Sequence, residues 1–122
     1  MSAALKIGQL GTTYGGGPMA CAAMLACIEA IESQRLLENV RQVSETIRRT
    51  CQVGPVSAVQ GEGLLLGLRM RRPAKQIQAE LLRRGILAGT ATDPEILRLL
   101  PPFILQAQHV ELLRRALADI GE

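Results

Sequence analysis

Residues 56–70 read VSAVQGEGLLLGLRM, and this stretch contains two strand-like runs, 56–60 and 64–70, around the turn Gly61-Glu62-Gly63. In the second run every other residue is a large apolar one, so one face of the strand is apolar. The residues of that face are Leu64, Leu66, Leu68 and Met70. Two runs joined by a glycine-containing turn predict an antiparallel element of a small sheet.

Downstream of this stretch, the pattern alternates between helix and strand. A helix is expected from Pro73 to Gly85, and a final helix with a buried apolar stripe over Gln106–Ile120. Between them, Ile86–Gly89 and Glu95–Leu100 are typical of strands, and two prolines stop the second one. The order strand, strand, helix, strand, strand, helix predicts an α+β fold, a small sheet covered on one face by helices.

Two helices are expected upstream of the sheet. The first, Pro18 to about Glu32, carries small residues on one side, and the second, about Gln34 to Cys51, has an apolar residue at every third or fourth position. No sheet precedes them on which the small-residue side could rest. The chain is therefore interpreted as the tail of something larger or as part of an oligomer.

The composition excludes several classes of protein. The chain has 122 residues, 48% apolar and 20% charged, which is typical of one globular domain. No apolar run is long enough for a membrane span, and no secretory leader is recognisable. With 2% aromatic residues and a net charge of +3 spread along the chain, nucleic-acid binding is disfavoured. Three cysteines without CxxC spacing predict no metal site and favour a reducing, cytoplasmic compartment.

The segment Gly11-Thr-Thr-Tyr-Gly-Gly-Gly17 leads directly into the helix that begins at Pro18. Free N–H groups at a helix N-terminus, together with the hydroxyls of Thr12 and Thr13, make a plausible cradle for a phosphate. The segment is not a Walker loop, because no GK[ST] follows, and no strand precedes it as in a dinucleotide fingerprint. The alternative interpretation is a flexible turn before a helix.

Arg98 lies in the otherwise apolar stretch 95–102, EILRLLPP. An arginine in such a stretch either reaches water or pairs with an anion. One hypothesis is a clamp for a carboxylate, and the other is an arginine on an edge strand that points to solvent. His109 is expected at an exposed position of the last helix, and neither Lys6 nor Lys75 lies in a buried setting suited to Schiff-base chemistry.

Several motifs resemble those of class III, pyridoxal-phosphate-dependent aminotransferases, with the acetylornithine and ornithine type as the nearest subgroup. Residues 11–23, GTTYGGGPMACAA, resemble the signature G[ST]T[FY]GGNPLACAA of the family. The later motifs follow in the family's order: LLENV at 36–40, GEGLLLG at 61–67, the helix-to-strand joint at 81–87, and ILRLLPP at 96–102. Two positions depart from the family pattern, Leu10 in place of His and Gly17 in place of Asn.

The resemblance implies the C-terminal portion of a fold type I enzyme. Residues 1–33 would belong to the large domain, and residues 34–122 would form the small C-terminal domain. Thr13 would bind the cofactor phosphate of the opposite subunit of a homodimer, Thr12 would lie beside it near the substrate, and Arg98 would hold the substrate α-carboxylate. The Schiff-base lysine lies upstream in the family, so no catalytic residue is assigned and this chain alone is not expected to catalyse.

Two other functions remain open on the sequence alone. One is a truncated, non-catalytic domain that binds an anion or a partner, and the other is a free-standing regulatory domain that binds an amino acid. The absence of a suitable lysine argues against catalysis by this chain alone, whereas the phosphate loop and Arg98 together argue against a purely structural relic.

Overall fold

The computed structural model describes residue 11 and residues 13–121. Contacts divide the chain into two compact units, Met1–Arg35 and Leu36–Glu122. The described part of the first unit is dominated by helix α1 (Pro18–Ser33), and all other helices and strands belong to the second. Pro18 occupies the first helical turn and Gly17 before it is extended, which is how prolines favour helix starts.

Helix α2 (Leu36–Thr50) begins two residues later than the sequence predicts. The reason is Arg35, whose φ of 51° is left-handed and breaks the helical path after α1. From there α2 is amphipathic, with Val43, Ser44 and Ile47 buried on its inner side.

The sheet has four antiparallel strands in the order β1-β2-β4-β3. They are β1 (Val56–Glu62), β2 (Leu65–Met70), β3 (Gly89–Thr90) and β4 (Ile96–Leu99). The predicted turn at 61–63 is displaced, because β1 continues to Glu62 and the chain reverses at 63–64. Gly61 makes this possible: its φ is 108°, and a Cβ there would overlap the Leu65 carbonyl oxygen.

The strand predicted over Ile86–Gly89 is wrong for most of its length, since only Gly89 and Thr90 pair with β4. The backbone of this segment finds other partners. The Ile86 amide donates to the Leu81 carbonyl at 2.9 Å, and the Gln78 side-chain Nε2 donates to the Ala88 carbonyl at 2.8 Å. These bonds hold the segment against the end of α3 (Ala74–Arg83) and away from the ladder.

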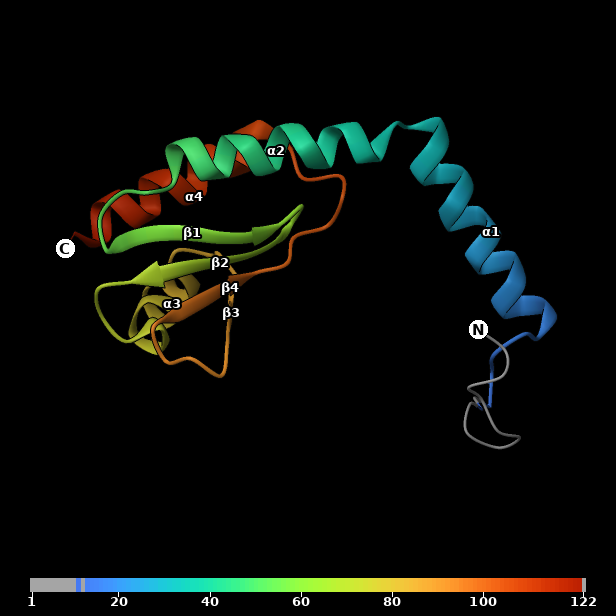
Figure 1. Cartoon of the computed structure of the whole chain (residues 1–122), viewed down its shortest axis with the longest axis horizontal. Coiled ribbons are helices and arrows are strands. Elements are labelled where there is room, and N and C mark those ends of the chain that lie inside the picture. Colours follow the sequence, from blue (N-terminus) through green and yellow to red (C-terminus); the bar gives the residue numbers. More distant parts are fainter. Residues whose placement is uncertain (1–10, 12, 122) are drawn as a thin grey trace. The chain divides into compact units, whose positions relative to one another are not determined.

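The core lies on one face of the sheet, as predicted. Helices α2, α3 and α4 (Ala107–Ile120) contribute side chains to one buried cluster with that face, and Figure 1 shows α2 and α4 running along the sheet. Fully buried members include Ile47, Leu66, Leu68, Ile77, Leu81, Leu97 and Leu117. The register places Leu66 opposite Leu99 and Leu68 opposite Leu97, so these four side chains share the inner face.

Helix α4 contacts the backbone that enters β1. Gly54 has a left-handed φ of 54°, and a Cβ there would overlap the carbonyl oxygen of Leu117. No side chain separates the two backbones at this position.

Candidate functional site

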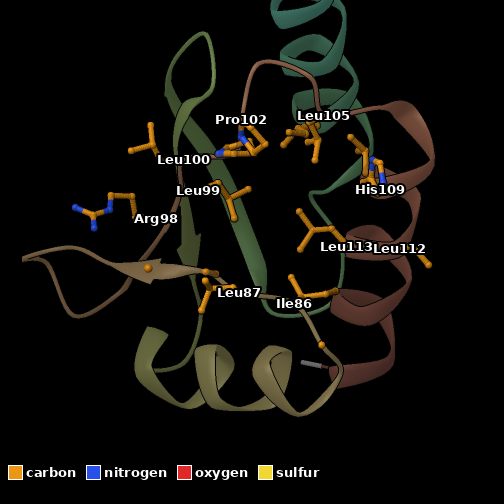
Figure 2. Close-up of a pocket in the computed structure, with 16 residues that line it drawn as sticks. Ile86, Leu87, Arg98, Leu99, Leu100, Pro102, Leu105, His109, Leu112 and Leu113 are labelled. Atoms are coloured by element: carbon orange, nitrogen blue, oxygen red, sulfur yellow. The ribbon is translucent and has the colours of Figure 1, made fainter. Parts of the chain in front are cut away.

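Arg98 lies on an inner strand, because β4 is hydrogen-bonded to β2 on one side and β3 on the other. The edge-strand hypothesis is therefore wrong, although the side chain is exposed. Residue alternation along β4 explains this exposure, since Leu97 and Leu99 face the core and Arg98 faces the opposite side. In Figure 2, the Arg98 side chain points away from α4, whereas Leu99 points toward it.

Glycines flank Arg98 on both neighbouring strands, since Gly67 of β2 and Gly89 of β3 are its direct cross-strand partners. The outer face of the sheet is therefore open around the guanidinium. A Cβ at Gly89 would lie 3.2 Å from Arg98 Nε and 3.3 Å from Nη2, so the guanidinium lies over the backbone of β3. A Cβ at Gly67 would instead contact Ile96 and Gln60.

The two acidic residues that precede β4, Asp93 and Glu95, form ion pairs with another arginine. Arg69 Nη1 donates to Glu95 Oε2 at 2.8 Å, and Arg69 Nη2 donates to Asp93 Oδ2 at 3.2 Å. Among the described residues, no carboxylate forms an ion pair with Arg98. Arg98 is thus an exposed cation without an acidic partner among the described residues.

A pocket of about 690 Å³ lies between the segment 85–89, the end of β4 and the start of α4. Its described lining is apolar except for two ionisable residues, Arg98 and His109. His109 is exposed, as the sequence predicts, and its Nδ1 accepts a hydrogen bond from the Gln106 amide at 3.2 Å. This hydrogen bond caps the first turn of α4, so the structure gives His109 a structural contact.

One side chain of α2 holds the loop between β4 and α4. Asn39 Nδ2 donates to the carbonyls of Phe103, at 2.6 Å, and Leu105, at 2.9 Å. The two acceptors follow the pair Pro101-Pro102, which cannot donate backbone hydrogen bonds to a ladder. Asn39 therefore holds the rim of the pocket in place.

The glycine-rich loop lies in the first unit. Thr13 is exposed there, and Gly16 has a left-handed φ of 78°. Among the described residues no side chain caps the N-terminus of α1, and the first turn of the helix contains no acidic residue. Its free N–H groups and partial positive charge therefore suit a phosphate. Thr12, the other predicted hydroxyl donor, lies outside the described residues.

The described lysine, Lys75, is exposed in the first turn of α3, and Lys6 lies outside the described residues. Of the three free cysteines, Cys21 and Cys27 are exposed, and Cys51 is buried. Burial raises the pKa of the Cys51 thiol. Within the described ranges, His, Cys, Asp and Glu form no group of three suited to a metal. Nor do those ranges contain a helix with the length and apolar character needed to cross a bilayer.

The sequence points to Arg98 and the loop before α1 as candidates, but it does not give the surroundings of Arg98. The sequence does not show that glycines flank Arg98 on both neighbouring strands, or that Arg69 forms ion pairs with Asp93 and Glu95. Both features depend on strand order and register. A weak signal existed in Gly67 and Gly89 themselves, since glycine within a strand often marks a close approach.

Comparison with known proteins gives a consistent result. The family model "Aminotransferase class-III" matches residues 1–120. The acetylornithine aminotransferase of Streptomyces coelicolor is 41% identical over 120 residues, which cover 95% of this chain and 30% of that protein. The acetylornithine aminotransferase 1 of Bordetella parapertussis is 36% identical over 118 residues, covering 93% of this chain and 30% of that protein. The chain thus spans about 30% of the length of these curated relatives.

Among solved structures, an amine transaminase of an uncultivated Pseudomonas species in the PLP-bound form has a TM-score of 0.75 and 28% identity. It covers 91% of this chain, which in turn covers 29% of it.

Proposed function

Because the chain belongs to the class III aminotransferases, we propose that it forms the C-terminal part of an enzyme that transfers the amino group of an amino acid such as acetylornithine or ornithine. Pyridoxal phosphate is the cofactor of this family. The relatives in Streptomyces and Bordetella, both acetylornithine aminotransferases by name, support this choice of substrate. Residues 1–33 would complete the large domain of the enzyme, and residues 34–122 would be its small domain.

Arg98 would bind the α-carboxylate of the substrate. The observation that carries this role is its lack of an acidic partner among the described residues, while Arg69 holds both Asp93 and Glu95. A guanidinium offers two parallel charge-assisted hydrogen bonds to the two oxygens of a carboxylate. Fixing the carboxylate orients the Cα–H bond, which must be broken in the reaction.

The loop before α1 would bind the cofactor phosphate. Thr13 and Thr12 would donate hydroxyl hydrogen bonds, and the uncapped N-terminus of α1 would add N–H groups and a favourable dipole. Pyridoxal phosphate, when bound, supplies an electron sink for the charge that develops at the substrate Cα. We place this phosphate contact across the interface of a homodimer, so that Thr13 serves the opposite subunit.

The catalytic amine would come from outside the described residues. Lys75 is exposed at the start of α3 and so lacks the buried setting that suits Schiff-base chemistry. The 122-residue chain alone is therefore expected to leave pyridoxal phosphate without a site-specific lysine adduct. Borohydride reduction followed by peptide mapping tests this, and stoichiometric labelling of Lys6 or Lys75 would contradict it. The three free thiols fit a cytoplasmic enzyme.

The decisive experiment is a chimera in which residues 1–122 replace the matching segment of the Streptomyces coelicolor enzyme. The chimera should use acetylornithine as amino donor. Arg98→Lys should lower kcat/KM for the donor roughly 30- to 150-fold, because a lysine cannot reproduce the paired hydrogen bonds. Arg49→Lys, on the exposed side of α2, is the matched control and should change nothing.

A folded chimera that retains cofactor but does not turn over an amino acid would contradict the aminotransferase proposal and favour a non-catalytic, anion-binding role. If Arg98→Lys releases cofactor and leaves kcat/KM unchanged, the role of Arg98 is wrong.

Thr13→Ala should act on the cofactor instead. The variant chimera should lose pyridoxal phosphate faster on dialysis, by roughly 10- to 100-fold in dissociation constant, because one charge-assisted hydrogen bond to the phosphate is missing. Thr92→Ala, in the exposed loop between β3 and β4, is the matched control. Retention equal to that of the unsubstituted chimera would remove Thr13 from the phosphate site.

A further inference from the structure

We propose that Gly89 is a positioning residue for Arg98. Because residue 89 has no side chain, the Arg98 guanidinium lies directly on the backbone of β3, and this contact sets the direction of the guanidinium. This inference rests on the proposed role of Arg98 in binding a carboxylate. It adds a residue that neither touches substrate nor carries a polar side chain.

The contact is direct and one-sided. Three guanidinium-side atoms of Arg98 lie near the place where a Cβ of residue 89 would be: Nε at 3.2 Å, Nη2 at 3.3 Å and Cζ at 3.6 Å. On the opposite side, a Cβ at Gly67 would meet Ile96 Cγ2 at 3.0 Å and no atom of Arg98 within the nearest three. The side chain of Arg98 therefore leans toward β3, whereas side chains of Ile96 and Gln60 lie over Gly67 of β2.

Backbone strain does not explain the glycine. The φ of Gly89 lies outside the left-handed region, so no left-handed backbone conformation requires a glycine here. A β-branched residue would even suit a strand better than glycine does. What a side chain at position 89 would change is the space under the guanidinium.

The backbone of β3, on which the guanidinium lies, is held in place by a hydrogen bond from α3. Strand β3 has two residues, Gly89 and Thr90, and contributes little ladder of its own. The half-buried Gln78 of α3 adds the hydrogen bond to the Ala88 carbonyl, immediately before Gly89. The backbone under Arg98 is thereby tied to a helix as well as to β4.

Direction matters for Arg98 because no ion pair within the described residues sets it. A free arginine side chain has many rotamers, and binding a carboxylate through two parallel bonds selects few of them. A side chain at position 89 would press against Nε and Nη2, two donors of the fork, and move them by tenths of an ångström or into another rotamer. The carboxylate would then accept one hydrogen bond from the guanidinium in place of two.

The first test reads the guanidinium directly in the 122-residue chain. The ¹⁵N-edited NMR signal of Arg98 Nε–Hε, assigned by its loss in Arg98→Lys, should shift in Gly89→Val. Thr90→Val, next along β3 and facing the other side, should leave that signal in place. An unchanged Arg98 signal in a folded Gly89→Val chain would overturn the proposal.

The second test uses the chimera with the Streptomyces coelicolor enzyme. Gly89→Val should raise KM for acetylornithine roughly tenfold, as expected for loss of one charge-assisted hydrogen bond, with kcat changed less than KM. Gly89→Ala should give a smaller rise in the same direction. Cofactor retention and the melting temperature should stay at the values of the unsubstituted chimera, which a merely structural defect would not allow.

The double variant separates this inference from the proposed function. If Gly89 acts through Arg98, Gly89→Val adds nothing to the loss already caused by Arg98→Lys. An effect of Arg98→Lys without any effect of Gly89→Val overturns the role of Gly89 alone. No effect of Arg98→Lys on kcat/KM overturns the proposed role of Arg98, whatever Gly89→Val does. Additive losses overturn the coupling between the two residues.

Discussion

The two units of the chain, Met1–Arg35 and Leu36–Glu122, contrast in how they are stabilised. Helix α1 has 16 residues and none of them is buried. Its exposed large apolar residues include Met19, Met24, Leu25 and Ile28. The second unit buries side chains from three helices and the sheet in one cluster. Local signals such as Pro18 and an alanine-rich sequence favour a helix in α1, whereas the second unit is stabilised by burial of apolar area.

The largest expected difference between the units is in stability. Leu97→Ala, which removes a fully buried side chain at the centre of β4, should lower the free energy of unfolding of the second unit by about 2–5 kcal/mol. Leu25→Ala on α1, where the side chain is 56% exposed, should change it by less than about 0.5 kcal/mol. Urea denaturation followed by circular dichroism measures both, and equal losses would contradict the contrast.

A smaller effect of the same contrast concerns thiol reactivity. Cys21 and Cys27 are exposed on α1, whereas Cys51 is buried and burial raises the pKa of its thiol. Because only the thiolate reacts, two thiols per chain should be alkylated promptly by iodoacetamide at neutral pH, and Cys51 should follow only when the second unit opens. Mass spectrometry of timed samples shows the order. Prompt labelling of Cys51 would mean that its surroundings are not closed.

The smallest expected effect is on the surface of the second unit. Hydrogen bonds from Arg114, at 2.6 Å, and Arg115, at 2.7 Å, lower the pKa of Glu111 to about 2. Because the pKa is lowered in the folded state, this carboxylate stabilises the fold above pH 4.5, and the contribution is lost as the pH falls toward 2. Glu111→Gln should lower the melting temperature slightly at neutral pH and leave it unchanged at pH 2. A difference that grows toward low pH would reverse the sign.

The sequence predicted the α+β architecture because its elements are marked locally. Alternating leucines mark β2, and the stripe of Val110, Leu113 and Leu117 marks α4. The run Ile86–Gly89 predicts a strand, and the prediction fails for most of it because an apolar run does not reveal that a distant side chain, Gln78, binds its backbone. Apolar composition does not even establish burial here, since Leu87 is exposed, and the partner of a carbonyl group depends on tertiary structure.

The candidate site divides in the same way. Arg98 stood out from the sequence because a charge in an apolar stretch needs an explanation, and Thr13 because it precedes a helix that begins at a proline. Strand order could not be read from the sequence, since β2 and β4 are separated by α3 and β3 yet lie side by side. That order places glycines on both sides of Arg98 and excludes an edge position.

At Gly54 the second unit has a close contact between two backbones. Where two elements touch through side chains, rotamer changes can absorb a small displacement of one against the other. At Gly54 the backbone itself contacts the Leu117 carbonyl of α4, and no side chain is available to yield. We therefore expect a displacement of the end of α4 to shift the start of β1, and through the ladder to reach β2 and β4. The position of the strand that carries Arg98 would then depend on how α4 is held.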